Sequence, residues 1–201
     1  MKLRAGLAIA VLLLAGACGG SDDPPDDKAS PTKSPSASEP SAVELVAAPG
    51  AVGPVLVGMT VDEANATGFF EPRETPDDDP CKEAYGPIQW KAPHTEDLLV
   101  GVRNEGPTKD EIGVMGIRDS VKTAKGVGIG STLDDVKAAY PDAKVEESEA
   151  SGAVVFRKDG EKWLGIAFNE QPNEVKGSSK VIFMEVTSGE KPVAYLSGCS
   201  Y

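Results

Sequence analysis

A ten-residue pattern occurs twice in this chain and constrains the fold more than any other feature. The first copy is VLVGMTVDEA, residues 55–64, and the second is VGIGSTLDDV, residues 127–136. In each copy a threonine, Thr60 or Thr132, stands three positions before an acidic residue, Glu63 or Asp135. This spacing is typical of a helix N-terminal capping box. The sequence therefore predicts two short helices that start 72 residues apart.

Each predicted helix is followed by three stretches with strand composition, separated by turn residues such as Asp159-Gly160. The expected fold class is therefore α+β, built as two repeats over residues 43–122 and 123–201. Each repeat is expected to be a short helical segment followed by a three-stranded antiparallel meander. The predicted strands are 88–91, 98–104 and 112–118 in the first repeat, and 153–158, 162–169 and 181–187 in the second.

The first 17 residues have the composition of a secretory signal peptide. Lys2 and Arg4 precede an apolar run over residues 5–14, and the small residues AGA, 15–17, follow it directly before Cys18. The apolar run is too short to span a bilayer, which takes about 20 residues in a helix. We therefore expect cleavage between Ala17 and Cys18, and export of the rest of the chain.

The segment before Cys18 resembles the lipobox of bacterial lipoproteins, with Ala15 where leucine is usual. The resemblance implies that Cys18 is diacylated with palmitate-like chains and becomes the new N-terminus. Two acyl chains give stable anchoring, which places the protein on the extracytoplasmic face of the cell membrane. The same site also suits an ordinary signal peptidase, so secretion without an anchor is the alternative.

Residues 18–42 hold the lipidation cysteine and a tether rich in proline, serine and aspartate. Such a segment buries too little apolar area to fold. This layout of anchor and spacer resembles that of actinobacterial lipoproteins. The formal net charge is −12, and no run of basic residues follows residue 5. Nucleic-acid binding is therefore not expected, because it needs a basic face that neutralises phosphates.

The chain has three cysteines, Cys18, Cys81 and Cys199. An odd count in an exported protein leaves one thiol over. If Cys18 carries lipid, then Cys81 and Cys199 remain as a pair in an oxidising compartment. The sequence therefore predicts a disulfide between Cys81 and Cys199.

No catalytic or metal-binding motif is evident. His94 is the only histidine and lies in a predicted loop, and the Asp77-Asp78-Asp79 run lacks the spacing of a calcium loop. We therefore expect no cofactor, no metal and no enzymatic activity. The alternative is an enzyme that uses His94 or a pair of carboxylates.

The strands of the second repeat are apolar on both faces, whereas a sheet with one solvated face should alternate cleanly. One interpretation is that the second face packs against the other repeat or a loop. The other is a binding face with Trp163 and Phe183 as anchors. This second interpretation favours a non-enzymatic binding or envelope-interaction module with a protein partner.

The Gly-x-Thr entries at Gly58 and Gly130, each followed by a short acidic-capped helix and a meander, resemble small lipoproteins of the SmpA/OmlA type. They also resemble the tandem-repeat architecture of the β-lactamase inhibitory proteins. The second resemblance implies an alternative function, inhibition of a secreted hydrolase.

Overall fold

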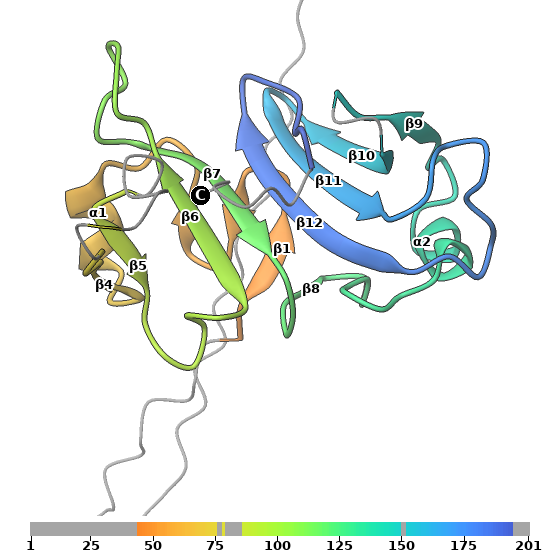
Figure 1. The fold of residues 1–201 in the computed structure, drawn as a ribbon, viewed down its shortest axis with the longest axis horizontal. Helices are drawn as coiled ribbons and strands as arrows, with labels where there is room; N and C mark the ends of the chain where they lie inside the picture. The colour runs from red at the N-terminus through yellow and green to blue at the C-terminus, as the bar shows by residue number, and fades with distance from the viewer. Residues whose placement is uncertain (1–43, 76–77, 79–85, 150–151, 195–201) are drawn as a thin grey trace, which may run out of the picture. The chain divides into compact units, whose positions relative to one another are not determined.

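The computed structural model describes residues 44–75, 78, 86–149 and 152–194, all within one compact unit that starts at Ala42. Cys18, Cys81 and Cys199 lie outside the described residues. The unit is mostly β, with 39% strand and 9% helix. Figure 1 shows its main element, a six-stranded antiparallel sheet in the order β6-β7-β12-β11-β10-β9. Its strands are β6 (Leu98–Val102), β7 (Ile112–Ile117), β9 (Val145–Glu147), β10 (Ala153–Asp159), β11 (Lys162–Phe168) and β12 (Val181–Ser188).

Two smaller sheets accompany the large one. The first has the order β3-β2-β1-β8, in which β1 and β8 run parallel, and the second consists of β4 and β5. Their strands are β1 (Val46–Ala48), β2 (Ala51–Val52), β3 (Val55–Leu56), β4 (Phe70–Pro72), β5 (Ile88–Trp90) and β8 (Lys122–Thr123).

The two helices are α1 (Val61–Ala66) and α2 (Leu133–Ala139). Thr60 and Thr132 are their N-caps, and both predicted capping boxes are present. The prediction of the helix starts is thus confirmed. The helices are short because Gly68, with φ +81°, follows α1, and Pro141 follows the C-cap of α2.

The prediction of two helix-plus-meander repeats is wrong. All six predicted strands exist, but β5 pairs with β4 and not with β6, so the first repeat has no three-stranded meander. The last strands of the two halves, β7 and β12, pair with each other, with Met115 opposite Val186 and Ile117 opposite Met184. The physical reason is that an unpaired apolar strand edge is unfavourable, and joining β7 to β12 removes two such edges. The result is one sheet shared by both halves.

The six-stranded sheet has two faces with different surroundings. Its first face is defined by the buried side chains of Met115, Ile117, Leu164, Ile166, Met184 and Val186. These belong to the main hydrophobic cluster, together with Val52 of β2, Ala64 of α1 and Val136 of α2. The second face carries a separate small cluster of four buried residues: Val154, Ala167, Phe183 and Ala194.

Candidate binding face

The middle of the second face is a row of residues aligned across the strands by register. Glu185 of β12 lies directly opposite Gly116 of β7 on one side and Gly165 of β11 on the other. Because glycines lack side chains, Glu185 has no side chain beside it at either of its two cross-strand positions. The Phe183 ring and the Leu99 side chain fill the space over Gly116, where a Cβ would lie only 2.8 Å from the ring.

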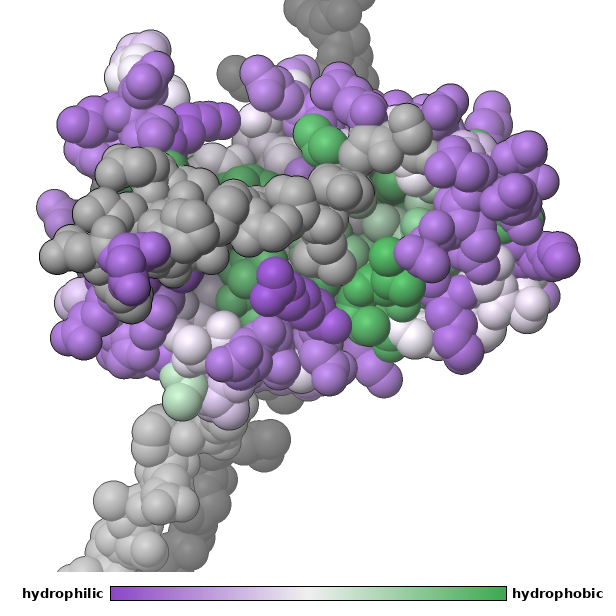
Figure 2. Space-filling model, viewed as in Figure 1, coloured by the Kyte–Doolittle hydropathy of each residue, from purple (hydrophilic) through white to green (hydrophobic). Residues whose placement is uncertain are grey.

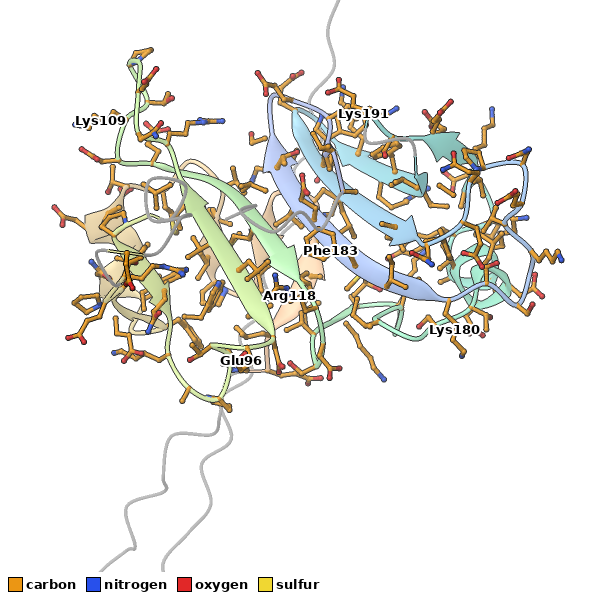
Figure 3. All side chains as sticks on the ribbon, in the orientation of Figure 1. Glu96, Lys109, Arg118, Lys180, Phe183 and Lys191 are labelled. Carbon is orange, nitrogen blue, oxygen red and sulfur yellow. The ribbon has the colours of Figure 1, made fainter. Side chains whose placement is uncertain are left out.

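Phe183, one of the two predicted anchors, is only 1% exposed. Figure 3 shows its side chain on the near side of β12, the side of the second face. It packs in the small cluster with Val154, Ala167 and Ala194. Phe183 is therefore a core residue and offers no exposed surface to a partner.

Trp163, the other predicted anchor, is partly exposed and lies near the β10–β11 hairpin. Its ring meets that of Phe156 of β10 edge to face, with centroids 6.2 Å apart. The indole Nε1 is buried and has no hydrogen-bond acceptor among the described residues. An unpaired buried donor costs about 1–3 kcal/mol, which offsets part of the stability gained by burying the indole ring.

Two lysine side chains lie against this aromatic pair. Lys158 Nζ is 4.5 Å from the centroid of the Trp163 ring. Lys191 Nζ is 4.0 Å from that of Phe156 and 6.0 Å from that of Trp163. Lys191 also forms an ion pair with Glu146 of β9, at 2.7 Å. We call Phe156, Trp163 and the two lysines the aromatic corner.

Figure 2 shows the same side of the molecule in space-filling form. Apolar side chains of described residues are visible in several separate places over the sheet, and hydrophilic side chains lie toward the edges of the view. Leu99 and Phe156 are partly exposed hydrophobic residues of this face. The second face is thus an apolar surface that the described residues cover only in part.

His94 lies in the turn between β5 and β6 and is partly exposed. Its backbone carbonyl accepts hydrogen bonds from Asp97 and Leu98. Its side-chain Nδ1 is buried without a hydrogen-bond partner among the described residues. No acid or nucleophile is therefore hydrogen-bonded to Nδ1 in the described part of the chain, as a catalytic triad would need.

Carboxylates do not gather into a metal site in the described part of the chain: no group of three or more His, Cys, Asp or Glu side chains lies close enough to hold an ion there. Of the acidic run, only Asp78 is described. An open hollow beside the start of β12 is lined by a mixture of acidic and basic side chains, among them Glu174, Lys176 and Lys180. Its Ser179 hydroxyl is already used by Glu170, at 2.7 Å, so nothing there points to a ligand.

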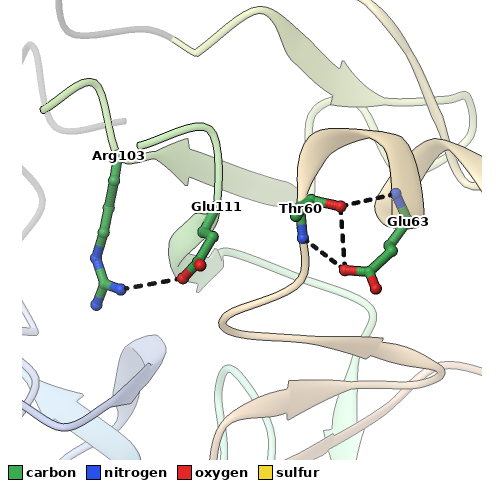
Figure 4. A network of polar contacts seen from close by, with 4 residues as sticks. All are labelled: Thr60, Glu63, Arg103 and Glu111. Carbon is green, nitrogen blue, oxygen red and sulfur yellow. Dashed lines mark hydrogen bonds and ion pairs between the residues drawn. The ribbon is translucent and has the colours of Figure 1, made fainter. Parts of the chain in front are cut away.

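The clearest electrostatic features are the two capping boxes, of which Figure 4 shows the first. The backbone N–H and the hydroxyl of Thr60 donate to the Glu63 carboxylate, at 2.9 and 3.0 Å, and lower its pKa. The equivalent donors of Thr132, at 2.8 and 2.7 Å, lower the pKa of Asp135. These carboxylates stabilise helix starts and are not available for proton transfer at neutral pH.

Sequence reasoning missed Glu185 and Lys191. Glu185 is 4% exposed, and its carboxylate accepts hydrogen bonds from the backbone of Val193 and Ala194. A signal was present, because Glu185 is the single acidic residue within the apolar stretch VIFMEV, 181–186. A buried carboxylate requires hydrogen-bond donors, and the segment after β12 supplies them.

Among the described residues no helix is long and apolar enough to cross a membrane. Comparisons of the chain with protein-family models, with curated proteins and with solved structures find no match. The function must therefore be argued from the residues themselves.

Proposed function

We propose that this chain is a lipid-anchored, non-enzymatic binding protein of the extracytoplasmic face of the cell membrane, and that it binds a protein partner through the aromatic corner. The anchor is Cys18, at the end of the export signal. The observation that carries the binding role is the partly exposed Phe156–Trp163 pair at the margin of an apolar face that the described residues cover only in part. Tryptophan is among the side chains that most often dominate the binding energy of protein interfaces.

The aromatic corner suits binding better than packing. A half-buried tryptophan gives a partner a large apolar area with little loss of side-chain freedom. The two lysines place positive charge on the corner, since both ammonium groups lie over the aromatic rings and that of Lys191 is also paired with Glu146.

The alternative, inhibition of a secreted hydrolase, came from a resemblance based on two helix-plus-meander repeats, which the structure does not have, and it stays a prediction. No described residue favours inhibition of a hydrolase over other kinds of binding.

The anchor is tested by expressing the full chain and its Cys18→Ser variant in an actinobacterial host supplied with labelled palmitate. We expect label and membrane association for the natural chain, and neither for the variant. Mass spectrometry of the mature N-terminus gives the attached chains directly. An unmodified Cys18 at the natural N-terminus would contradict the anchor.

The binding role is tested by crosslinking in living cells with the full chain carrying a short-range photo-crosslinking residue at position 158. We expect one dominant crosslinked partner, which is lost in a Trp163→Ala background. Leu56→Ala is the matched control, since Leu56 is 38% exposed on another sheet, and it should leave the crosslink intact. Equal crosslinking in both backgrounds would rule out the aromatic corner as the binding surface.

A disulfide between Cys81 and Cys199 remains a proposal, since both cysteines lie outside the described residues. It would close a loop of more than 100 residues and, in the loop-entropy model, stabilise the fold by about 4–5 kcal/mol. Peptide mapping without reduction decides it: a linked pair of peptides supports the bridge, and two separately alkylated thiols exclude it.

A further inference from the structure

The chain places one of its own segments on the second face. We call residues 189–194 the strap. After β12 the chain turns back, with the Gly189 N–H donating to the Glu161 carbonyl at 2.8 Å and the Thr187 hydroxyl donating to the Glu190 carbonyl at 2.5 Å. The strap then lies over β11 and forms three different contacts with the second face.

The first contact is to the backbone of the strap. The Glu185 carboxylate accepts the Val193 N–H at 3.2 Å through Oε1 and the Ala194 N–H at 3.1 Å through Oε2. Ala194 has φ +52°, the left-handed conformation that turns successive N–H groups toward one side. Charge-assisted hydrogen bonds to a carboxylate are about twice as strong as neutral ones. This contact depends on backbone donors and not on particular side chains.

The second contact is steric. A Cβ on Gly165 would lie 3.1 Å from the Pro192 Cβ and 3.3 Å from the Ala194 Cβ. The bare backbone of Gly165 is therefore a shelf that admits a proline ring and a small side chain directly against the sheet.

The third contact is to a cation. The Lys191 ammonium lies 4.0 Å from the Phe156 ring centroid and 2.7 Å from Glu146 Oε2. An ammonium group between an aromatic face and a carboxylate is stabilised by both. The second face thus contacts a lysine, a proline and a small residue, in that order along the strap.

We propose that the second face is a recognition site for a cationic peptide segment of the type Lys-Pro-x-Ala, and that the strap is its resident ligand. A partner segment would displace the strap and form the same three contacts: its ammonium with Phe156 and Glu146, its small residues on Gly165, and its backbone N–H groups with Glu185. The inference rests on the binding role proposed above and names the chemistry of the partner.

Charge complementarity selects a cationic occupant. The chain has a net charge of −12, so its field attracts a basic segment and repels an acidic one. Lys158 would repel the positive charge of such a segment. Its ammonium, however, lies over the Trp163 ring and not over the Phe156 ring, where the ammonium of the segment would bind. Because the strap is tethered, its effective concentration is in the millimolar range, and a free peptide competes with it only weakly. A protein partner overcomes this competition through further contacts.

The experiment uses the full chain with Lys191→Glu, which removes the resident ammonium and sets a carboxylate against Glu146, so that the strap is held less firmly. The probe is the peptide acetyl-Glu-Lys-Pro-Val-Ala-Tyr-amide, titrated while the indole N–H resonance of Trp163 is followed by NMR. We expect saturable shifts, and at least tenfold weaker binding of the same peptide with glutamate in place of lysine. Lys109→Glu is the charge-matched control, since Lys109 lies in the β6–β7 loop, and it should not increase peptide binding (Figure 3).

Binding of the peptide with the expected lysine preference supports the inference. It is overturned if neither peptide shifts Trp163 in the Lys191→Glu chain, if the two peptides bind equally, or if Lys109→Glu has the same effect. Lys191→Met, which removes the charge without reversing it, repeats the measurement should Lys191→Glu impair folding. If the crosslinked partner is lost in Trp163→Ala while the peptide fails to bind, the aromatic corner binds a partner of different chemistry.

Discussion

The two faces of the six-stranded sheet are covered in different ways. The first face packs against small strands and both helices in one large cluster, with side chains such as Met184 and Ile166 fully buried. The second face has a cluster of four buried residues and a strap held by a few polar contacts. A face covered by many interdigitated side chains contributes stability, whereas on the second face the described residues place only one short segment. We therefore expect the first face to supply most of the stability, and we propose the second as the face that binds a partner.

The largest expected effect is on the first face. Met184→Ala should lower the free energy of unfolding by about 2–5 kcal/mol, because it leaves a cavity in a closely packed cluster. Urea denaturation followed by circular dichroism measures it. Ile182→Ala, two residues away and 39% exposed, should change it by less than about 0.5 kcal/mol. Similar losses for both variants would contradict the assignment of stability to this face.

On the second face, Glu185→Gln should cost about 1–3 kcal/mol, because an amide supplies only one acceptor for two strap N–H groups and brings donors of its own. Binding of an apolar dye should increase at the same time, since the strap detaches from an apolar surface. Glu190→Gln, an exposed charge change on the strap itself, is the control and should do neither. A stable variant without increased dye binding would show that Glu185 does not hold the strap.

Gly165→Ala tests the shelf. The added Cβ would lie 3.1–3.3 Å from two strap residues, so the strap must move by a few tenths of an ångström, at a cost of about 1 kcal/mol. Gly152→Ala, whose Cβ would have no neighbour closer than 3.8 Å among the described residues, should be neutral or slightly stabilising. Thermal unfolding compares the two, and equal melting temperatures would argue against close packing of the strap.

The capping boxes make the stability of the two helices that pack on the first face depend on pH. The folded-state pKa values of Glu63 and Asp135 lie below their ordinary values of 4.5 and 3.8. Their stabilising contributions are therefore complete above those ordinary values and are lost as the pH falls through the lowered ones. In Glu63→Gln, stability should fall less steeply with decreasing pH below about pH 5 than in the natural chain. Unfolding midpoints across that range check the expectation, and identical slopes would refute it.

The smallest expected change in stability is that of Trp163→Phe, which is compared with Trp90→Phe. Trp90 Nε1 donates to the Leu99 carbonyl at 3.3 Å, so Trp90→Phe should cost about 1–2 kcal/mol in lost hydrogen bonding and packing. In Trp163→Phe the lost ring area is offset by removal of an unpaired buried N–H, and stability should change by no more than about 0.5 kcal/mol. Equal losses in the two variants would mean that Trp163, too, has a purely structural role.

Local features were readable in the sequence, and their assembly was not. The capping boxes at Thr60 and Thr132 and the positions of all six predicted strands follow from short-range spacing and alternation. The pairing of β5 with β4, and of β7 with β12, joins residues far apart in the chain. Strand composition indicates which residues form strands. Several apolar strands fit each sheet edge equally well, so the pairing partners are decided only when the whole sheet forms.

The candidate site, too, was predictable from the sequence only in part. The apolar second face and Trp163 were evident from alternation, since both faces of the predicted strands carried large side chains. The burial of Phe183, and the roles of Glu185 and Lys191, depend on a strap that returns over β11 and reaches Glu146, 45 residues earlier in the chain. Alternation reveals which side chains share a face, but not what covers it.

The sequence by itself therefore determined the helix starts, the strand positions and the existence of an apolar second face, because these depend on neighbours within a few residues. Only the tertiary structure decided that the two halves form one sheet, that Phe183 is core, and that the strap is held on Glu185. These outcomes depend on burial and hydrogen bonding between distant segments, which compete with one another until the chain is compact.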